Sequence, residues 1–287
     1  MKKIGFIGIG VMGKSMAINL LKNGYEVQIY SRTKEKALPV MENGAIWCDS
    51  IESCVKGCHA VITIVGYPKD VEEVYFKDNG IIANAEKGTY LIDMTTTSPK
   101  LSEKIYAESK KHGLKALDAP VSGGDTGAKN ATLSIMVGGD EEDYNQCMPL
   151  LKCLGTNIIY EGGAGKGQHT KMANQIAIAG AMSGLCEAIS YGKTMGLNTE
   201  TMLQSISTGA AGSWQMSNLG PKILQEDFNP GFFIKHFIKD MKIALEESHH
   251  KDLSLPVLSD VLQMYIDLEK KNLGDLGTQG LIKHYGK

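Results

Sequence analysis

Three glycines near the N-terminus have a spacing that suits the binding of a phosphate. Gly8, Gly10 and Gly13 form the pattern GxGxxG, between an apolar run typical of a buried strand and a run with helical periodicity. In that context the glycines let the backbone turn and approach a pyrophosphate at the positive N-terminal end of the helix. We therefore predict a dinucleotide site in this stretch. Its other residues are Ile9, Val11 and Met12.

Arg32, the sole arginine of the chain, is a second candidate. It lies between Ser31 and Thr33, where the second predicted strand ends. In NAD-binding versions of this arrangement, an Asp or Glu about 20 residues beyond the glycines accepts hydrogen bonds from the adenosine ribose. No carboxylate stands here, and a guanidinium can instead bind a 2′-phosphate through paired, charge-assisted hydrogen bonds. These residues predict NADP(H) as the cofactor, with Thr33 either capping the next helix or donating to the phosphate.

The elements that must position these groups alternate between two periodicities up to residue 163. Strand-like segments lie at 3–9, 26–31, 45–47, 60–65, 89–94, 115–120, 133–139 and 156–162. Helical segments lie at 12–24, from 33, from 50, near 69–76, at 99–112 and at 140–152. This alternation predicts an α/β fold, a Rossmann-type, doubly wound and mainly parallel sheet.

Beyond residue 163 the pattern becomes helical, and no strand-like segment follows. The predicted helices are 167–195, 199–207, 213–226, 234–250 and 255–271. We therefore predict two domains: an NADP-binding Rossmann domain at 1–163 and an all-helical domain at 164–287 for substrate binding and oligomerisation. Apolar and small residues on its helix faces favour a homodimer or homotetramer built through the second domain.

Composition restricts the class of partner. The net charge is -2 and the pI about 6.4, with neither half basic, which predicts no nucleic-acid partner. No apolar run reaches the roughly 20 residues of a membrane span, so we expect a cytoplasmic protein without a membrane partner. The six cysteines form no CxxC pair, which favours reduced thiols and no metal site.

Three further segments carry a resemblance to a known family. They are DAPVSGGDTGA (118–128), GKGQHTKMANQ (165–175) and FFIKHFIKDMKIAL (232–245). With GIGVMG, in this order and across essentially the whole chain, they resemble the β-hydroxyacid dehydrogenase family. The resemblance implies an NADP(H)-dependent oxidoreductase that interconverts a small β-hydroxyacid, or a related hydroxy acid, and its semialdehyde or keto acid. The partner implied is a small carboxylate-bearing aldehyde or hydroxy acid.

The resemblance also implies roles for individual residues. In the family's GxGxxxKxxN pattern the lysine is catalytic, and it is Lys171 here, a general acid and base, while Asn174 orients the substrate. The family's SGG motif, which binds the substrate carboxylate, is Ser122, Gly123 and Gly124. Positions that match the family's cofactor-lining residues are Val65, Gly66, Thr95, Lys239 and Asp240, of which Thr95 also faces the substrate.

Two alternatives remain open. An imine reductase-like enzyme shares the architecture but uses another proton donor, and a non-catalytic NADP-binding module keeps the fold without the lysine. Lys171, Asn174 and the SGG motif favour the hydroxyacid enzyme over both. The stretch VGYPKD (65–70) differs from the MLP-type stretch of the 3-hydroxyisobutyrate branch. This difference favours the NADPH-using reductase branches and leaves the identity of the hydroxy acid open.

Overall fold

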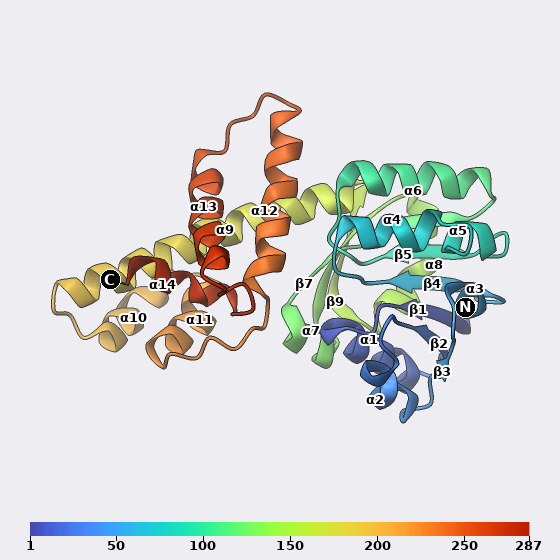
Figure 1. Ribbon diagram of the computed structural model, residues 1–287, viewed down its shortest axis with the longest axis horizontal. Helices are drawn as coiled ribbons and strands as arrows, with labels where there is room; N and C mark the ends of the chain where they lie inside the picture. Colours follow the sequence, from blue (N-terminus) through green and yellow to red (C-terminus); the bar gives the residue numbers. More distant parts are fainter. Residues whose placement is uncertain (287) are drawn as a thin grey trace. The chain divides into compact units, whose positions relative to one another are not determined.

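Two units make up the chain, Met1–Lys171 (unit 1) and Met172–Lys287 (unit 2), in a computed structural model that describes residues 1–286 (Figure 1). Unit 1 combines strands and helices, and unit 2 is helical. Helix α9 (Lys166–Thr194) begins in unit 1 and continues into unit 2. The assignment of cofactor binding to 1–163 and of substrate binding to 164–287 stays a prediction.

A nine-stranded sheet runs through the described part of unit 1. Its strands are β1 (Lys3–Ile7), β2 (Glu26–Tyr30), β3 (Ile46–Trp47), β4 (Ala60–Thr63), β5 (Tyr90–Asp93), β6 (Lys115–Asp118), β7 (Val121–Ser122), β8 (Leu133–Gly138) and β9 (Gly155–Gly162). The order is β3-β2-β1-β4-β5-β6-β8-β7, with β9 paired to β8. The first six of these strands are parallel, and β8 runs antiparallel to β6 and β7. The predicted doubly wound, mainly parallel sheet is confirmed.

Both faces of the central strands are covered by an apolar core. Successive side chains of a strand point to opposite faces, so alternate residues belong to different cores. Ile4 and Phe6 of β1 join one apolar core, and Ile7 joins the other. The first core includes residues of α1 (Val11–Lys22), α2 (Leu38–Met41), α7 (Gly124–Asn130) and α8 (Glu141–Leu151). The second includes residues of α3 (Ile51–Val55), α4 (Pro68–Phe76), α5 (Ile81–Asn84) and α6 (Pro99–Lys111). The strand order reverses at β1, next to β4, which is where such sheets bind ligands.

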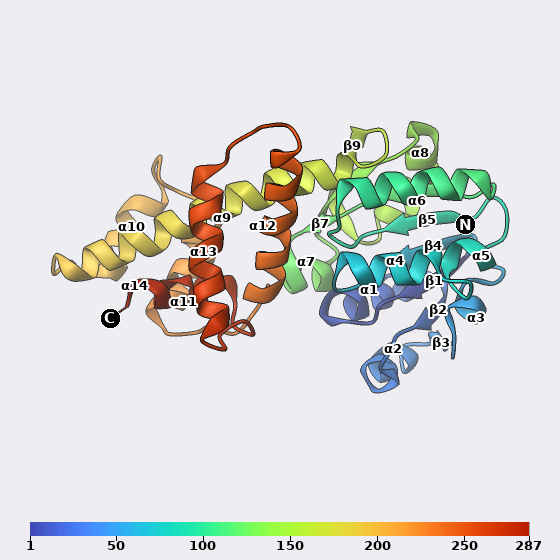
Figure 2. The same cartoon turned by 45° about the horizontal axis from the view of Figure 1, so that its top comes forward.

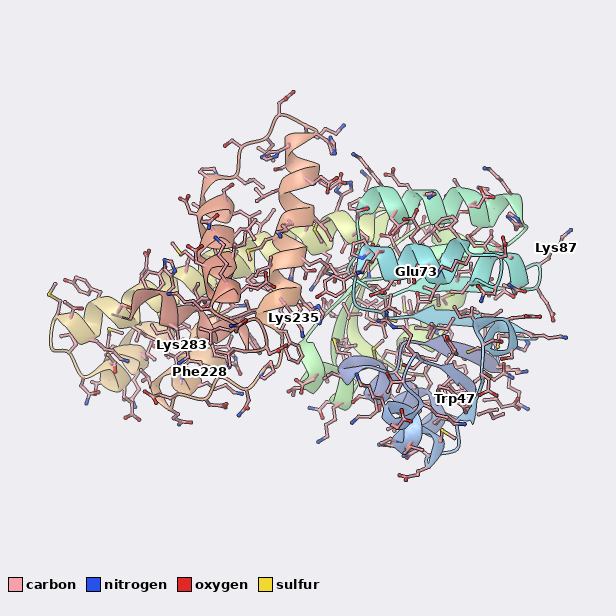
Figure 3. The ribbon with its side chains drawn as sticks, in the orientation of Figure 1. Trp47, Glu73, Lys87, Phe228, Lys235 and Lys283 are labelled. Carbon is pink, nitrogen blue, oxygen red and sulfur yellow. The ribbon has the colours of Figure 1, made fainter. Side chains whose placement is uncertain are left out.

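Helices build unit 2, as predicted. After α9 come α10 (Thr199–Ser207), α11 (Trp214–Leu224), α12 (Ile234–His249), α13 (Pro256–Lys270), a 3₁₀ turn (Thr278–Leu281) and α14 (Ile282–Tyr285). Helices α12 and α13 lie side by side (Figure 2), where the buried rings of Phe237 and Tyr265 have centroids 5.3 Å apart. Lys283 of α14 places its ammonium 4.2 Å from the centre of the Phe228 ring (Figure 3), which fastens the last turn. Among the described residues no helix has both the length and the apolar character needed to cross a bilayer.

Three short helices, α5, α7 and α14, were not predicted, because each is too short to show a helical period. The most relevant is α7, because it begins at Gly124, within the SGG motif. Packing against α1 stabilises α7: Ala128 is fully buried, and its carbonyl accepts a 2.8 Å hydrogen bond from Nδ2 of Asn19. Strand β1 also ends at Ile7 instead of residue 9, because Gly8 turns the chain with a φ of 106°.

A buried carboxylate ends β5 and holds the segment that follows. Asp93 is 2% exposed, and its Oδ1 accepts hydrogen bonds from Oγ1 of Thr63 at 2.8 Å and from the backbone N–H of Thr95 at 3.1 Å. Burial raises the pKa of Asp93 to about 6, although these hydrogen bonds oppose the rise. Ionised Asp93 therefore lowers the stability of the fold, while its hydrogen bond fixes the position of Thr95.

We expect Asp93→Asn to change the pH dependence of stability. The raised pKa means that the contribution of Asp93 to folding is fully present below about pH 4 and is lost as the pH rises through about 6. The asparagine keeps Oδ1 as an acceptor and carries no charge. At pH 7.5 the variant should be more stable by up to about 3 kcal/mol, and below pH 4 the difference should vanish. Denaturant unfolding across this range tests the prediction, and parallel curves for the two proteins would contradict it.

Candidate active site

The turn between β1 and α1 uses its three glycines in different ways. A Cβ at Gly8 would lie 2.1 Å from the carbonyl oxygen of Ile64, and one at Gly13 would lie 2.0 Å from that of Gly8. A Cβ at Gly10 would meet nothing within 4 Å. Gly10 is the N-cap of α1, with no side-chain cap and no acidic residue in the first helical turn. Gly8 and Gly13 therefore serve packing, and Gly10 leaves open space over a helix N-terminus that suits an anion.

Arg32, expected at the end of β2, has an ion pair that the sequence did not predict. Its Nη1 donates a 3.0 Å hydrogen bond to Oδ1 of Asp70 on α4; the arginine side chain is 76% exposed and the aspartate side chain 9%. Oδ2 of Asp70 accepts a second bond, 3.1 Å long, from the backbone N–H of Tyr67. The guanidinium is thus tethered at one end and open to solvent elsewhere. Thr33 begins the 3₁₀ turn Lys34–Ala37, but its side chain makes no capping bond, so the capping role considered for it is not formed.

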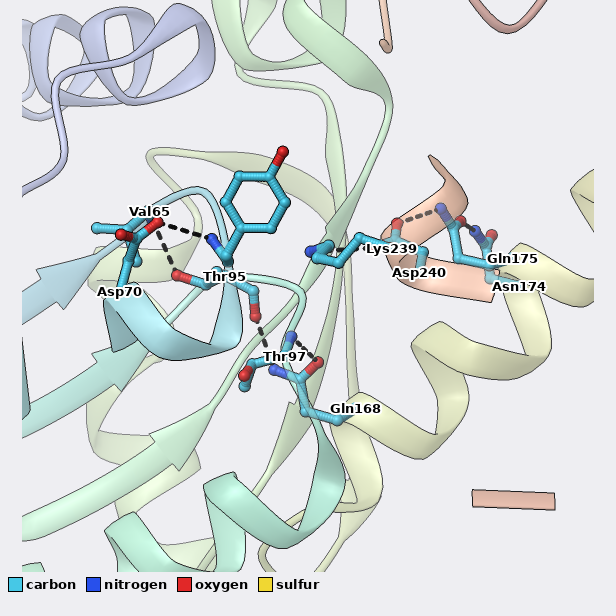
Figure 4. A network of polar contacts seen from close by, with 10 residues as sticks. Val65, Asp70, Thr95, Thr97, Gln168, Asn174, Gln175, Lys239 and Asp240 are labelled. Atoms are coloured by element: carbon cyan, nitrogen blue, oxygen red, sulfur yellow. Dashed lines mark hydrogen bonds and ion pairs between the residues drawn. The ribbon is translucent and has the colours of Figure 1, made fainter. Parts of the chain in front are cut away.

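The segments after β4 and β5 are bonded to each other. The backbone N–H of Val65 donates to Oγ1 of Thr95 at 3.0 Å, as Figure 4 shows. Thr95 is 1% exposed, so its hydroxyl serves this internal bond rather than an open face. Gly66 follows directly, and a Cβ there would lie 3.2 Å from Oδ2 of Asp70. The structure therefore brings together the predicted cofactor-lining residues Val65, Gly66 and Thr95.

The first turn of α9 is held against the sheet by two residues that sequence reasoning missed as site elements, Asp118 and Gln168. Oδ1 and Oδ2 of Asp118 accept the backbone N–H groups of Gly165 at 2.7 Å and Gln168 at 2.9 Å. The Gln168 side chain donates from Nε2 to the carbonyl of Thr95 at 2.7 Å and accepts at Oε1 from the N–H of Thr97 at 3.1 Å (Figure 4). Burial raises the pKa of Asp118, and the two N–H bonds oppose this. In the sequence, Asp118 and Gln168 stand out only because they lie in the motif segments 118–128 and 165–175.

Lys171 and the SGG motif also belong to unit 1. Lys171 lies on α9 one turn beyond Gln168 and is only 7% exposed. Ser122 ends β7, and Gly123 is the N-cap of α7 without a side-chain cap. Gly123 and Gly124 have φ values of 129° and 62°, which glycine adopts without strain. The turn thus combines a hydroxyl with backbone N–H groups at a helix start, a combination that suits a carboxylate.

Three further predicted site residues, Asn174, Lys239 and Asp240, form a polar chain with Gln175 in unit 2 (Figure 4). Nδ2 of Asn174 donates to Oε1 of Gln175 at 2.7 Å, and Nε2 of Gln175 donates to Oδ2 of Asp240 at 2.6 Å. The ammonium of Lys239 forms an ion pair with Oδ1 of Asp240 at 2.9 Å. Gln175 and Asp240 are each 1% exposed, and Gln175 was not predicted as a site residue. These contacts fix the orientation of the Asn174 amide, and the ammonium of Lys239 compensates the negative charge of Asp240.

Substitutions at two glycines should separate packing from ligand binding. Gly13→Ala places a methyl group against a backbone oxygen that cannot move aside, so we expect a clear loss of thermal stability. Gly10→Ala adds its methyl group to open space, so the melting temperature should stay close to wild type while affinity for a dinucleotide falls about 10-fold or more. Thermal unfolding and fluorescence titration with NADPH test this. Equal effects of the two substitutions on both measurements would contradict it.

Comparisons with known proteins place this chain among oxidoreductases. Residues 3–162 match the NAD-binding domain of 6-phosphogluconate dehydrogenase, and residues 165–285 match the "NAD-binding" domain of NADP-dependent 3-hydroxyisobutyrate dehydrogenase. The uncharacterized oxidoreductase YkwC of Bacillus subtilis is 54% identical over 286 residues, covering all of this chain and 99% of its own. Probable 3-hydroxyisobutyrate dehydrogenase-like 1 of Arabidopsis thaliana is 44% identical over 98% of this chain and 84% of its own.

A solved structure shows the same likeness. The 3-hydroxyisobutyrate dehydrogenase of Mycobacterium tuberculosis, solved with L-serine, has a TM-score of 0.91 and 29% identity, covering 99% of this chain and 98% of its own. The matched profiles span both units, and the relatives match over nearly the whole chain. The chain therefore belongs to the β-hydroxyacid dehydrogenase family, whose members are oxidoreductases that act on hydroxy acids and carry a nicotinamide-nucleotide-binding domain.

Proposed function

We propose that this protein is an NADP(H)-dependent enzyme that interconverts a small β-hydroxyacid, or a related hydroxy acid, and its semialdehyde or keto acid. The observation that carries the proposal is the position of Lys171. It is a buried lysine on the first turns of α9, and that helix start is hydrogen-bonded to the segment after β5. A buried lysine in this place suits proton transfer to or from a substrate oxygen.

The residues of unit 1 fit a bound dinucleotide. The open space at Gly10 and the uncapped start of α1 suit its pyrophosphate, and Arg32 with Ser31 and Thr33 suits a 2′-phosphate. When bound, the reduced cofactor supplies a hydride to the carbonyl carbon. The roles of Val65 and Gly66 toward the cofactor are part of this proposal.

Lys171 completes the reaction by moving one proton. In reduction its ammonium donates a proton to the carbonyl oxygen, which becomes the hydroxyl. In oxidation the neutral amine takes that proton back. Ser122 with the N–H groups at Gly123 and Gly124 binds the substrate carboxylate. Asn174, three residues beyond Lys171 on α9, shares its helix face and orients the same substrate.

Lys171→Ala tests the chemical role. We expect NADPH oxidation with one of glyoxylate, succinic semialdehyde, tartronate semialdehyde or methylmalonate semialdehyde, and a fall of about 100-fold or more in kcat for the variant. Lys166→Ala is a matched control, because Lys166 is an exposed lysine at the start of the same helix. It should keep kcat within about twofold. NADPH binding without turnover of any aldehyde would shift weight to an imine reductase-like enzyme or a cofactor-binding module.

Arg32→Asp tests the choice of cofactor. The change replaces the guanidinium with a charge that repels a 2′-phosphate and beside Asp70 adds a second anion. We expect the KM for NADPH to rise at least about 10-fold more than the KM for NADH. Lys87→Asp, a charge change of the same size at an exposed position in a loop, is the control. Equal losses for both cofactors would exclude Arg32 as the selector.

Exposed apolar side chains in unit 2 support an oligomer. Tyr191 and Met195 near the end of α9 and Trp214 at the start of α11 are 63%, 58% and 62% exposed. Large exposed apolar side chains suit a contact between copies of the chain. We propose a homodimer or homotetramer built through unit 2.

A further inference from the structure

Gln168 has a side chain with no exposed surface and with both ends of its amide occupied. Nε2 donates to the carbonyl of Thr95 at 2.7 Å, and Oε1 accepts from the N–H of Thr97 at 3.1 Å. Both partners are main-chain groups of one short segment (Figure 4). A side chain bonded in this way fixes the distance between its own helix and that segment, because neither bond can be replaced by water in a buried place.

The bonds continue on both sides of Gln168. Toward the sheet, Thr95 receives the N–H of Val65 on Oγ1 at 3.0 Å, so the segments after β4 and β5 move together. On the other side, the main-chain N–H of Gln168 donates to Asp118, at the end of β6, at 2.9 Å, which holds the start of α9. Lys171 lies three residues further along α9, about 4.5 Å along the helix axis. One continuous set of hydrogen bonds thus runs from Val65 to the helical turn that carries Lys171.

We infer that Gln168 is a positioning residue that sets Lys171 relative to the segments after β4 and β5. The inference rests on the proposed function, in which those segments line the cofactor and Lys171 moves the proton. Hydride and proton must reach the two atoms of one carbonyl bond, about 1.2 Å apart. A misplacement of that size is enough to slow a reaction about 100-fold. Gln168 joins the segments that line the cofactor, from which the hydride reaches the carbonyl carbon, to the helix that carries Lys171, from which the proton reaches the carbonyl oxygen.

A buried amide could also serve stability alone, so a control needs the loss of a buried side-chain hydrogen bond to a main-chain carbonyl elsewhere in unit 1. Thr89 meets this requirement. It is 3% exposed, and its Oγ1 donates to the carbonyl of Cys58 at 3.1 Å. It directly precedes β5, whereas Gln168 is bonded to the segment that follows this strand. Thr89→Val removes a buried side-chain hydrogen bond to a main-chain carbonyl and leaves the Gln168 contacts in place.

The test compares Gln168→Met with Thr89→Val. We expect Gln168→Met to lower kcat about 10- to 100-fold while the KM for NADPH changes by less than about threefold. The primary isotope effect with 4-deuterated NADPH should increase, because the chemical step becomes slower than product release. In the cofactor-free protein, the N–H of Thr97 should exchange with solvent faster. Thr89→Val should keep kcat and the Thr97 exchange close to wild type at a comparable loss of melting temperature.

Gln168→Glu serves if the methionine variant does not fold. Its carboxylate still accepts from Thr97 but cannot donate to Thr95, so the same fall in kcat is expected. Wild-type kcat in either variant, or an equal loss of kcat in Gln168→Met and Thr89→Val, would overturn the positioning role. If Lys171→Ala retains turnover, or wild type turns over no acid aldehyde, the proposed function fails and the inference fails with it. If Lys171→Ala is inactive and the Gln168 variants are fully active, only the inference fails.

Discussion

The candidate site depends on one constraint, the close packing of the start of α9 against the sheet. The two oxygens of Asp118 take the N–H groups of Gly165 and Gln168, which a helix start leaves without partners. The helix can come this near because residue 167 is a glycine. A Cβ there would lie 2.3 Å from the carbonyl oxygen of Met136. The spacing of this motif therefore has a packing reason at Gly167, beside the chemical role that we propose for Lys171.

At the proposed cofactor site, too, a side chain is held by a residue that is distant in the sequence: Arg32 is held by Asp70. A lone guanidinium at the end of β2 would sample many rotamers, and Asp70 restricts it through an ion pair from α4. Because Asp70 is itself bonded to the Tyr67 N–H, its position is fixed by the helix start. An arriving 2′-phosphate would share Arg32 with this carboxylate. If Arg32 selects the cofactor as we propose, the choice between NADP and NAD would depend on the Arg32–Asp70 pair and not on the arginine alone.

The order and type of the main elements could be predicted from the sequence, because buried parallel strands and amphipathic helices leave clear periodicities. The short helices could not, and α7 shows why: its glycine-rich sequence disfavours a helix, and packing against α1 overrides this. The contacts that hold the site also have no local signal. Arg32 and Asp70 are 38 residues apart, Thr95 and Gln168 are 73 apart, and Gln175 and Asp240 are 65 apart. Motifs identify which residues matter, whereas the fold decides which of them meet.

The different surroundings of the three glycines near the N-terminus have a consequence for descent within the family. Gly8 and Gly13 are required by the backbone oxygens beside them, whether or not any ligand binds. Gly10 faces open space, so the fold alone does not restrict it. A descendant of this chain that ceased to bind a dinucleotide would be free to drift at Gly10 and would still be held at the other two. A pattern with the first and third glycines kept and the middle one replaced is therefore the mark of a retained fold whose ligand has been lost.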